Sequence, residues 1–231
     1  MNETTTHLSR QFDEDLERLR SSVLEMGGLV ETQINSTTKA FADGNHEAIL
    51  SVLKNDRDVN NFEKAIDEDC IHVIAMRQPT ASDLRLVMSV SKIVTDLERS
   101  GDEIKKMAKN IRRIQERENK VRDSNADVRH IAKAASAQLR SALDCFARLD
   151  TNAAKEVILA DEALDSEFKA IVRQLITYMM EDPRSISTAL DVITIARAIE
   201  RVGDHAKNIA EQVIYIVEGR DVRHTRRSKK K

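Results

Sequence analysis

Several kinds of residue are scarce in this sequence of 231 amino acids. Aromatic residues make up 3% and tryptophan is absent, so few side chains are available for stacking on single-stranded nucleic acid. Acidic and basic residues nearly cancel, at a formal net charge of −2, which argues against duplex DNA as a partner. No apolar run approaches the ~18 residues that a membrane span needs, and the polar N-terminus is not a secretory signal. We therefore expect a cytoplasmic protein with no nucleic-acid partner.

Cysteine and the turn-forming residues are also few. Cys70 and Cys145 stand alone, without CxxC spacing, which is typical of buried, reduced thiols in a cytosolic protein. Six glycines and two prolines leave little turn chemistry for a sheet protein. These shortages favour an all-helical chain.

The residues that are abundant, and their periodicity, indicate long helices. From Leu8 to Phe41 apolar residues recur at steps of three or four, which is one face of a helix of about ten turns. Gly27 and Gly28 interrupt this stretch without shifting its register, so they predict a bend or a close packing point. The same pattern predicts six helices in all, over about residues 8–41, 46–77, 81–118, 126–148, 151–181 and 183–218.

The six expected helices are two copies of a three-helix unit. The only two prolines, Pro79 and Pro183, fall at corresponding joints. "LERSGD" (97–102) matches "IERVGD" (199–204) at an offset of 102 residues, and earlier positions match at an offset of 105. Three amphipathic helices can close a bundle of their own, and a unit of this length is too long for a solenoid repeat.

This duplication sets the predicted domain organisation. We predict an all-α fold of two tandem three-helix bundles, at residues 1–118 and 124–219. The basic segment at residues 220–231 is expected to be a disordered tail. It is either a solubilising end or a contact for an anionic lipid surface or an acidic partner.

Each copy carries two carboxylates four residues apart on its third helix. Residues at this spacing share one helical face, where like charges destabilise a helix by a few tenths of a kcal/mol. A glycine precedes each aspartate, although glycine inside a helix costs up to about 1 kcal/mol relative to alanine. We expect it to admit a neighbouring helix close to the acids. The second helix of each copy adds a matching pair, so the candidate metal ligands are Glu98, Asp102, Asp56 and Asn60 in the first copy and Glu200, Asp204, Asp161 and Asp165 in the second.

Groups of oxygen ligands of this kind suit hard cations such as Mg²⁺, Mn²⁺ or iron, and do not suit structural zinc. Asn60 stands where the second copy has Asp165, so the first site would carry less negative charge. The alternative is that these acids are solvated and paired with lysine and arginine. His205 lies about 140° around the helix from Glu200, and we expect it at the surface.

The chain resembles the PhoU family of accessory and regulatory proteins of bacterial phosphate-specific transport. The resemblance covers nearly the whole chain and is carried by the doubled Glu-Arg-x-Gly-Asp motif and by "LKNDRDVNNFEKAIDEDCI" (53–71), "RQPTASDLRLVMSVSKIVTDLERSGDEIKKMAKN" (77–110) and "YMMEDPRSISTALDVITIARAIERVGDHAKNIAEQVIYIVEGRDVRH" (178–224). It implies two tandem three-helix bundles. It also implies E/DxxxD motifs that bind iron, manganese or magnesium in some members, which map onto Glu98, Asp102, Glu200 and Asp204.

The resemblance further implies a negative regulator of the phosphate-starvation response and of phosphate uptake. Such a protein links the phosphate ABC transporter to a membrane-bound sensor histidine kinase. The implied partners are that kinase and the ATPase subunit of the transporter, and the protein would be peripheral to the membrane through them. Members of the family often form homodimers.

Two other functional classes remain open. A carboxylate-bridged metal enzyme is one, but di-iron bundles use Glu-x-x-His motifs, and no histidine stands three residues after Glu98 or Glu200. A helical scaffold such as a membrane-curving dimer is the other, but it would need basic residues along one face, and here they cluster in the tail. We therefore predict a non-catalytic signalling adaptor.

Overall fold

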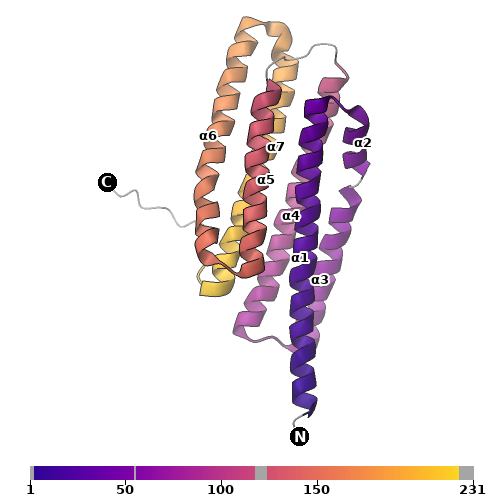
Figure 1. The fold of residues 1–231 in the computed structure, drawn as a ribbon, viewed down its shortest axis with the longest axis vertical. Helices are drawn as coiled ribbons and strands as arrows, with labels where there is room; N and C mark the ends of the chain where they lie inside the picture. The colour runs from indigo at the N-terminus through magenta and orange to yellow at the C-terminus, as the bar shows by residue number, and fades with distance from the viewer. Residues whose placement is uncertain (1–2, 55, 118–123, 224–231) are drawn as a thin grey trace, which may run out of the picture.

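The structure, a computed structural model, describes residues 3–54, 56–117 and 124–223. This part of the chain is helical and forms two tandem three-helix bundles, which confirms the predicted fold class (Figure 1). The helix expected over 46–77 is described as two helices on either side of residue 55, and the segment from residue 224 lies outside the described residues. The elements are α1 (Glu3–Asp43), α2 (His46–Lys54), α3 (Asp56–Arg77), α4 (Ala81–Gln115), α5 (Ser124–Arg148), α6 (Thr151–Glu181), the 3₁₀ turn η1 (Pro183–Ser185) and α7 (Ile186–Glu218).

The two bundles lie side by side and share one hydrophobic core. The first consists of α1 to α4 and the second of α5 to α7, and the core runs without interruption through both. The most extensive packing joins α4 of the first bundle to α7 of the second, while α1 packs along α5 (Figure 1). Because α4 and α7 are buried on two sides, each has a wide buried surface instead of the single apolar stripe of a surface helix.

Helices that meet between the bundles run antiparallel. Early residues of α4 contact late residues of α7, as Asp96 contacts His205, and later residues of α4 contact earlier ones of α7, as Glu103 pairs with Arg201. Antiparallel packing of two copies of one unit relates the bundles by a pseudo-two-fold axis across the helices. Equivalent features of the two copies therefore lie at opposite ends of the elongated molecule.

The first helix passes through its two glycines without a break. A Cβ on Gly27 would lie 2.5 Å from Leu143 Cδ2 of α5, so this glycine is a close packing point between the bundles, as the sequence suggested. Gly28 has no atom of another residue within 4 Å of the same position and faces open space. None of the described helices has the length and apolarity needed to span a bilayer.

Candidate functional site

The predicted acids of the second copy lie on two packed helices. Asp161 and Asp165 are one turn apart on α6, and Glu200 and Asp204 are one turn apart on α7. Asp161 is buried, and its Oδ2 accepts a hydrogen bond of 2.7 Å from Lys207 Nζ. Lys207 therefore stands among these acids as an internal counter-ion.

Glu200 is buried and only half satisfied. Its Oε1 accepts a hydrogen bond of 3.0 Å from Arg197, while its Oε2 is buried with no hydrogen-bond partner among the described residues. Burial raises the pKa of Glu200, the Arg197 guanidinium works against that rise, and the charges of Asp204 and Asp165 add to it. A buried carboxylate with an unpartnered oxygen is destabilised, so this position favours a proton or another cation.

Asp204, one turn later on α7, is exposed at the surface, but its carboxyl faces the same group of acids. Partial burial of this carboxyl raises its pKa, the charge of Asp161 raises it further, and Lys207 partly offsets this. Burial would lower the pKa of Lys207, but its hydrogen bond to Asp161 and the surrounding negative charge raise it overall, so the ammonium stays protonated. The four predicted acids of the second copy thus act on one another electrostatically.

The predicted acids of the first copy, where they are described, are more exposed than those of the second. Glu98 is half-buried on α4, Asp102 is exposed one turn later, and Asn60 is half-buried on α3. Asp56 opens α3, but its side chain lies outside the described residues. An acid that the sequence did not single out is Glu63 of α3, whose pKa is raised by burial and then by the charges of Asp67 and Asp102.

The predicted acids do not form a ready-made metal site, and two of them contact lysine side chains. Within residues 3–54, 56–117 and 124–223, no three or more histidine, cysteine, aspartate or glutamate side chains converge closely enough to hold one ion. Asp165 Oδ2 lies 3.9 Å from Lys169 Nζ, and Asp161 forms an ion pair with Lys207. A hard cation would therefore have to displace Lys207, and it would relieve the mutual repulsion of Glu200, Asp204 and Asp165.

The two glycines beside these acids differ in how tightly they are packed. A Cβ on Gly203 would overlap the side chain of Leu164 and lie 3.0 Å from Gln138 Oε1. A Cβ on Gly101 would meet Val59 Cγ1 at 3.4 Å, which is an ordinary contact. The predicted close approach of a helix is therefore present at Gly203 and much weaker at Gly101.

His205 is not at the surface, so that expectation was wrong. Its side chain is buried between α4 and α7, where Nδ1 lies 2.8 Å from Asp96 Oδ1. Asn208 Nδ2 donates to the same oxygen at 2.9 Å. The face of α7 opposite Glu200 is covered by the other bundle, and this polar cluster therefore joins the two bundles.

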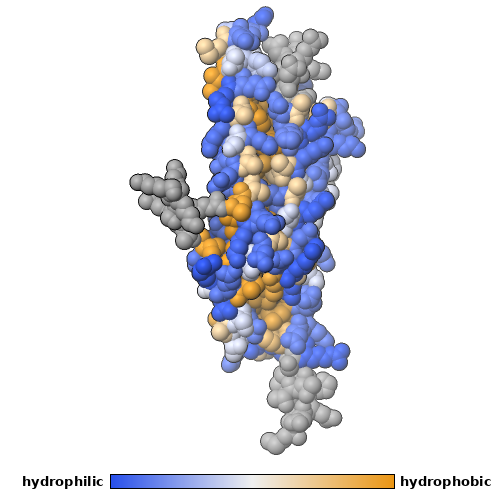
Figure 2. Space-filling model, turned by 60° about the vertical axis from the view of Figure 1, so that its left-hand side comes forward, coloured by the Kyte–Doolittle hydropathy of each residue, from blue (hydrophilic) through white to orange (hydrophobic). Residues whose placement is uncertain are grey.

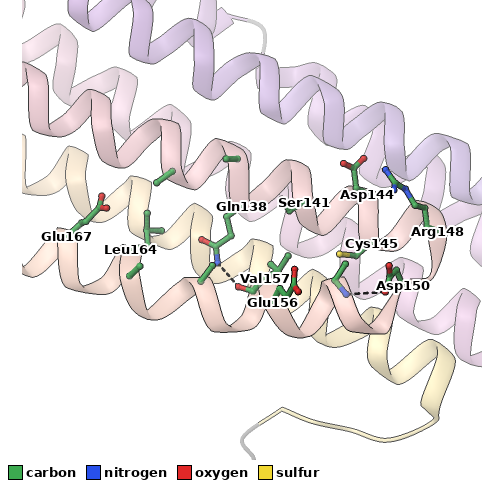
Figure 3. A pocket seen from close by; sticks show the side chains of 15 residues that line it. Gln138, Ser141, Asp144, Cys145, Arg148, Asp150, Glu156, Val157, Leu164 and Glu167 are labelled. Carbon is green, nitrogen blue, oxygen red and sulfur yellow. Dashed lines mark hydrogen bonds between the residues drawn. The ribbon is translucent and has the colours of Figure 1, made fainter.

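A groove of about 520 Å³ separates α5 from α6 (Figure 3). Small residues line much of it, and Gln138 at its wall donates at 3.4 Å both to the Val157 carbonyl and to Asp161, so the groove borders the acids of the second copy. Burial raises the pKa of the Cys145 thiol at the groove, so this cysteine is not an activated nucleophile. Figure 2, which brings the α6 side forward, shows hydrophobic side chains in a column between hydrophilic ones.

Comparison with known proteins decides the family. The family model described as the PhoU domain matches the chain twice, over residues 23–111 and 128–213. The chain belongs to the PhoU family. A "Phosphate-specific transport system accessory protein PhoU homolog" of Pseudomonas aeruginosa is 47% identical over 95% of this chain and 90% of its own length. The "Phosphate-specific transport system accessory protein PhoU" of Escherichia coli K12 is 40% identical over 94% of this chain and 90% of its own.

Solved structures of PhoU proteins have the same fold. The crystal structure of PhoU from Pseudomonas aeruginosa superimposes with a TM-score of 0.87 at 46% identity, covering 90% of this chain and all of that one. The phosphate transport system regulatory protein PhoU from Streptococcus pneumoniae superimposes with a TM-score of 0.85 at 28% identity, covering 91% and 99%. The relatives are named as accessory and regulatory proteins, so the chain is not an enzyme, which agrees with the sequence prediction.

Proposed function

We propose that this PhoU protein is a negative regulator of the phosphate-starvation response and of high-affinity phosphate uptake. In this role it couples the phosphate ABC transporter to a sensor histidine kinase, through contacts with the kinase and with the ATPase subunit of the transporter. It would work in the cytoplasm, peripheral to the membrane through these partners, and as a homodimer. Its action is by binding, because catalysis is not part of the family's role.

The single observation that carries this proposal is the likeness to named relatives along almost the whole chain. The Pseudomonas aeruginosa relative, an accessory protein of phosphate-specific transport, is 47% identical over 95% of this chain. Identity of this extent over nearly the whole of both chains makes an accessory role in phosphate transport the function to test first.

Gene deletion tests the regulatory role. A strain that lacks the gene and carries a reporter behind a phosphate-starvation promoter should express the reporter in high phosphate, and a plasmid copy of the gene should silence it. A reporter that stays silent in the deletion strain would contradict the proposal. Reporter activity in low phosphate, expected to be equal with and without the gene, controls for growth effects.

We also propose that the acids hold a hard divalent cation such as Mn²⁺, Mg²⁺ or iron. Glu200, Asp204, Asp165 and Asp161 would hold it in the second copy. Glu98, Asp102, Asn60 and Asp56, with Glu63 beside them, would hold it in the first. Two features support this: the donors are oxygen atoms, and Glu200 Oε2 is buried without a partner. The bound cation would neutralise charge and stiffen the contact of α6 with α7.

Metal content measured on variants tests the ligand assignment. Protein dialysed against Mn²⁺ should lose part of its bound metal in Glu200→Gln/Asp204→Asn and another part in Glu98→Gln/Asp102→Asn. A matched control is Asp144→Asn/Glu156→Gln, which removes the same charge at the α5–α6 groove. Equal metal content in the wild type and in a variant with all four ligand changes would show that these acids are not the ligands.

A further inference from the structure

Exposed apolar side chains gather at the same place in both copies. In the first copy they are Ile71 and Ile74 of α3 and Leu84 and Met88 of α4, here called the first apolar patch. In the second copy they are Ile176 and Met180 of α6, Ile186, and Leu190 of α7, here called the second apolar patch. Every member is at least 37% exposed, which is unusual for a cluster of large apolar side chains.

The members of each patch adjoin one another across two packed helices. In the first copy Ser91 Oγ donates to Asp67 Oδ1 at 2.9 Å, which holds α3 against α4. Ile71 lies one turn after Asp67, and Met88 lies one turn before Ser91, so the antiparallel helices place these two side chains together. The exposed apolar side chains of the first patch therefore adjoin across α3 and α4, and the repeat predicts the same arrangement of the second patch across α6 and α7.

Three of the four positions in each patch are equivalent in the two copies. Ile71 corresponds to Ile176 at the offset of 105 residues, and Leu84 and Met88 correspond to Ile186 and Leu190 at the offset of 102. Exposed leucines elsewhere are not duplicated: the counterpart of Leu50 is Lys155, and that of Leu159 is Lys54. Exposed apolar surface kept in both copies points to use in binding, since the core does not need it.

Both patches lie on one face of the molecule. The exposed side of α4 lies between the sides that contact α3 and α7, and the exposed side of α7 lies between those that contact α6 and α4. This face is opposite α1 and α5, which lie toward the viewer in Figure 1. Because α4 and α7 are antiparallel, the patches are at the two ends of this face, and Asp102 and Asp204 lie between them.

One equivalent position beside the patches carries opposite charges in the two copies. Glu68 lies one turn before Ile71, and Arg173 lies one turn before Ile176, at equivalent positions of the two copies. Both side chains are exposed, and neither has an ion-pair partner among the described residues. A first patch placed on a second patch would bring this acid and this base together, whereas identical patches placed together would oppose like charges.

We propose that a second copy of this chain docks on this face, with the first patch of each protomer on the second patch of its partner and Glu68 beside the partner's Arg173. A two-fold axis in the plane of the interface, at right angles to the line that joins the patches, makes both contacts at once. One patch offers on the order of 400 Å² of apolar surface, and the two together reach the ~800 Å² per partner of a stable interface. The inference rests on the dimer of the proposed function and assigns its surface.

Charge reversal and charge swap test the interface. Glu68→Arg and Arg173→Glu should each weaken dimerisation of the full chain at least tenfold in sedimentation equilibrium. The doubly reversed Glu68→Arg/Arg173→Glu should recover most of the loss, because both contacts regain opposite charges. Met88→Glu/Leu190→Glu should give monomers, and Leu50→Glu/Leu159→Glu, at similar exposure outside the patches, should dimerise like the wild type.

Several results would overturn the assignment. One is a wild type that stays monomeric up to 1 mM. Another is a dimer whose affinity is unchanged by the single charge reversals, and a third is a double reversal that dimerises no more tightly than either single one. Dimers in which Met88→Glu/Leu190→Glu has no effect would place the contact on another surface and leave the patches to a different protein. Circular dichroism checks that each variant is folded. The reporter assay separates this failure from failure of the regulatory role, since it is scored on the deletion strain alone.

Discussion

The packing difference between Gly101 and Gly203 gives a prediction with opposing terms. Replacing a glycine inside a helix by alanine gains up to about 1 kcal/mol from helix propensity. At Gly101 the new methyl group would meet Val59 at 3.4 Å, so most of that gain should appear as stability. At Gly203 it would overlap Leu164, which is buried, and approach Gln138 Oε1 to 3.0 Å. Overpacking of this kind costs about 1–3 kcal/mol, so the gain should be cancelled or reversed.

Urea denaturation of the two variants measures the difference. Gly101→Ala should raise the urea midpoint, and the free energy of unfolding of Gly203→Ala should be lower than that of Gly101→Ala by about 1–3 kcal/mol, with equal m-values. In a chain of this size each kcal/mol corresponds to about 2–4 °C in melting temperature, so calorimetry gives an independent reading. Leu164→Ala removes the overlapping atoms, and in that background Gly203→Ala should become stabilising. Equal midpoints for the two alanine variants would refute the idea that α6 packs more closely on Gly203 than α3 does on Gly101.

Three further outcomes follow from polar groups that are buried or partly buried. Burial raises the folded-state pKa of Glu200 and Asp204 above the unfolded-state values, so their contribution to stability is present below the unfolded-state pKa and lost as the pH rises through the folded-state pKa. Glu200→Gln/Asp204→Asn should therefore stabilise the metal-free protein at pH 7 and flatten the pH dependence of its melting temperature above about pH 4. An unchanged pH dependence would contradict this. Asp96→Ala leaves His205 buried without its partner and should cost about 1–3 kcal/mol in urea denaturation, far more than removal of an exposed acid. Burial raises the pKa of Cys70 to about 12, so a disulfide reagent should modify it only on unfolding; rapid modification of the native protein would show that the site is open.

The features that the sequence predicted correctly are set mainly by the residues within a single helix. Apolar spacing of three and four residues places the apolar side chains on one face of a helix, and the repeated Glu-Arg-x-Gly-Asp motif indicated the duplicated plan. The close approach at Gly203 was also foreseeable, because an interior glycine needs a packing reason. The weaker contact at Gly101 was not foreseeable, since it depends on the smaller Val59 standing where the second copy has Leu164.

The features that were missed depend on how the helices meet. His205 was expected at the surface because its angle was measured only against Glu200, but α7 is buried on two sides and its second side faces Asp96. Glu63 was missed because its counterpart at the offset of 105 is Phe168, so comparison of the copies concealed it. Lys207 stands three residues after Asp204 and could have been recognised as a counter-ion, but its choice of Asp161 required the packing of α6 on α7.

The acids and the apolar patches share one face, so cation binding and dimerisation should be coupled. Two copies paired through this face bring Asp102 and Asp204 of one protomer toward the same acids of the other, where like charges repel. A bound cation removes that repulsion, so Mn²⁺ should tighten the dimer by a factor of about 5–150, and dimerisation should tighten Mn²⁺ binding by the same factor. Sedimentation equilibrium with and without Mn²⁺, repeated with Asp102→Asn/Asp204→Asn, measures the coupling, because the variant should form the tighter dimer without metal. A dimer that Mn²⁺ weakens, or that responds equally in the variant, would show that the acids and the patches serve separate surfaces.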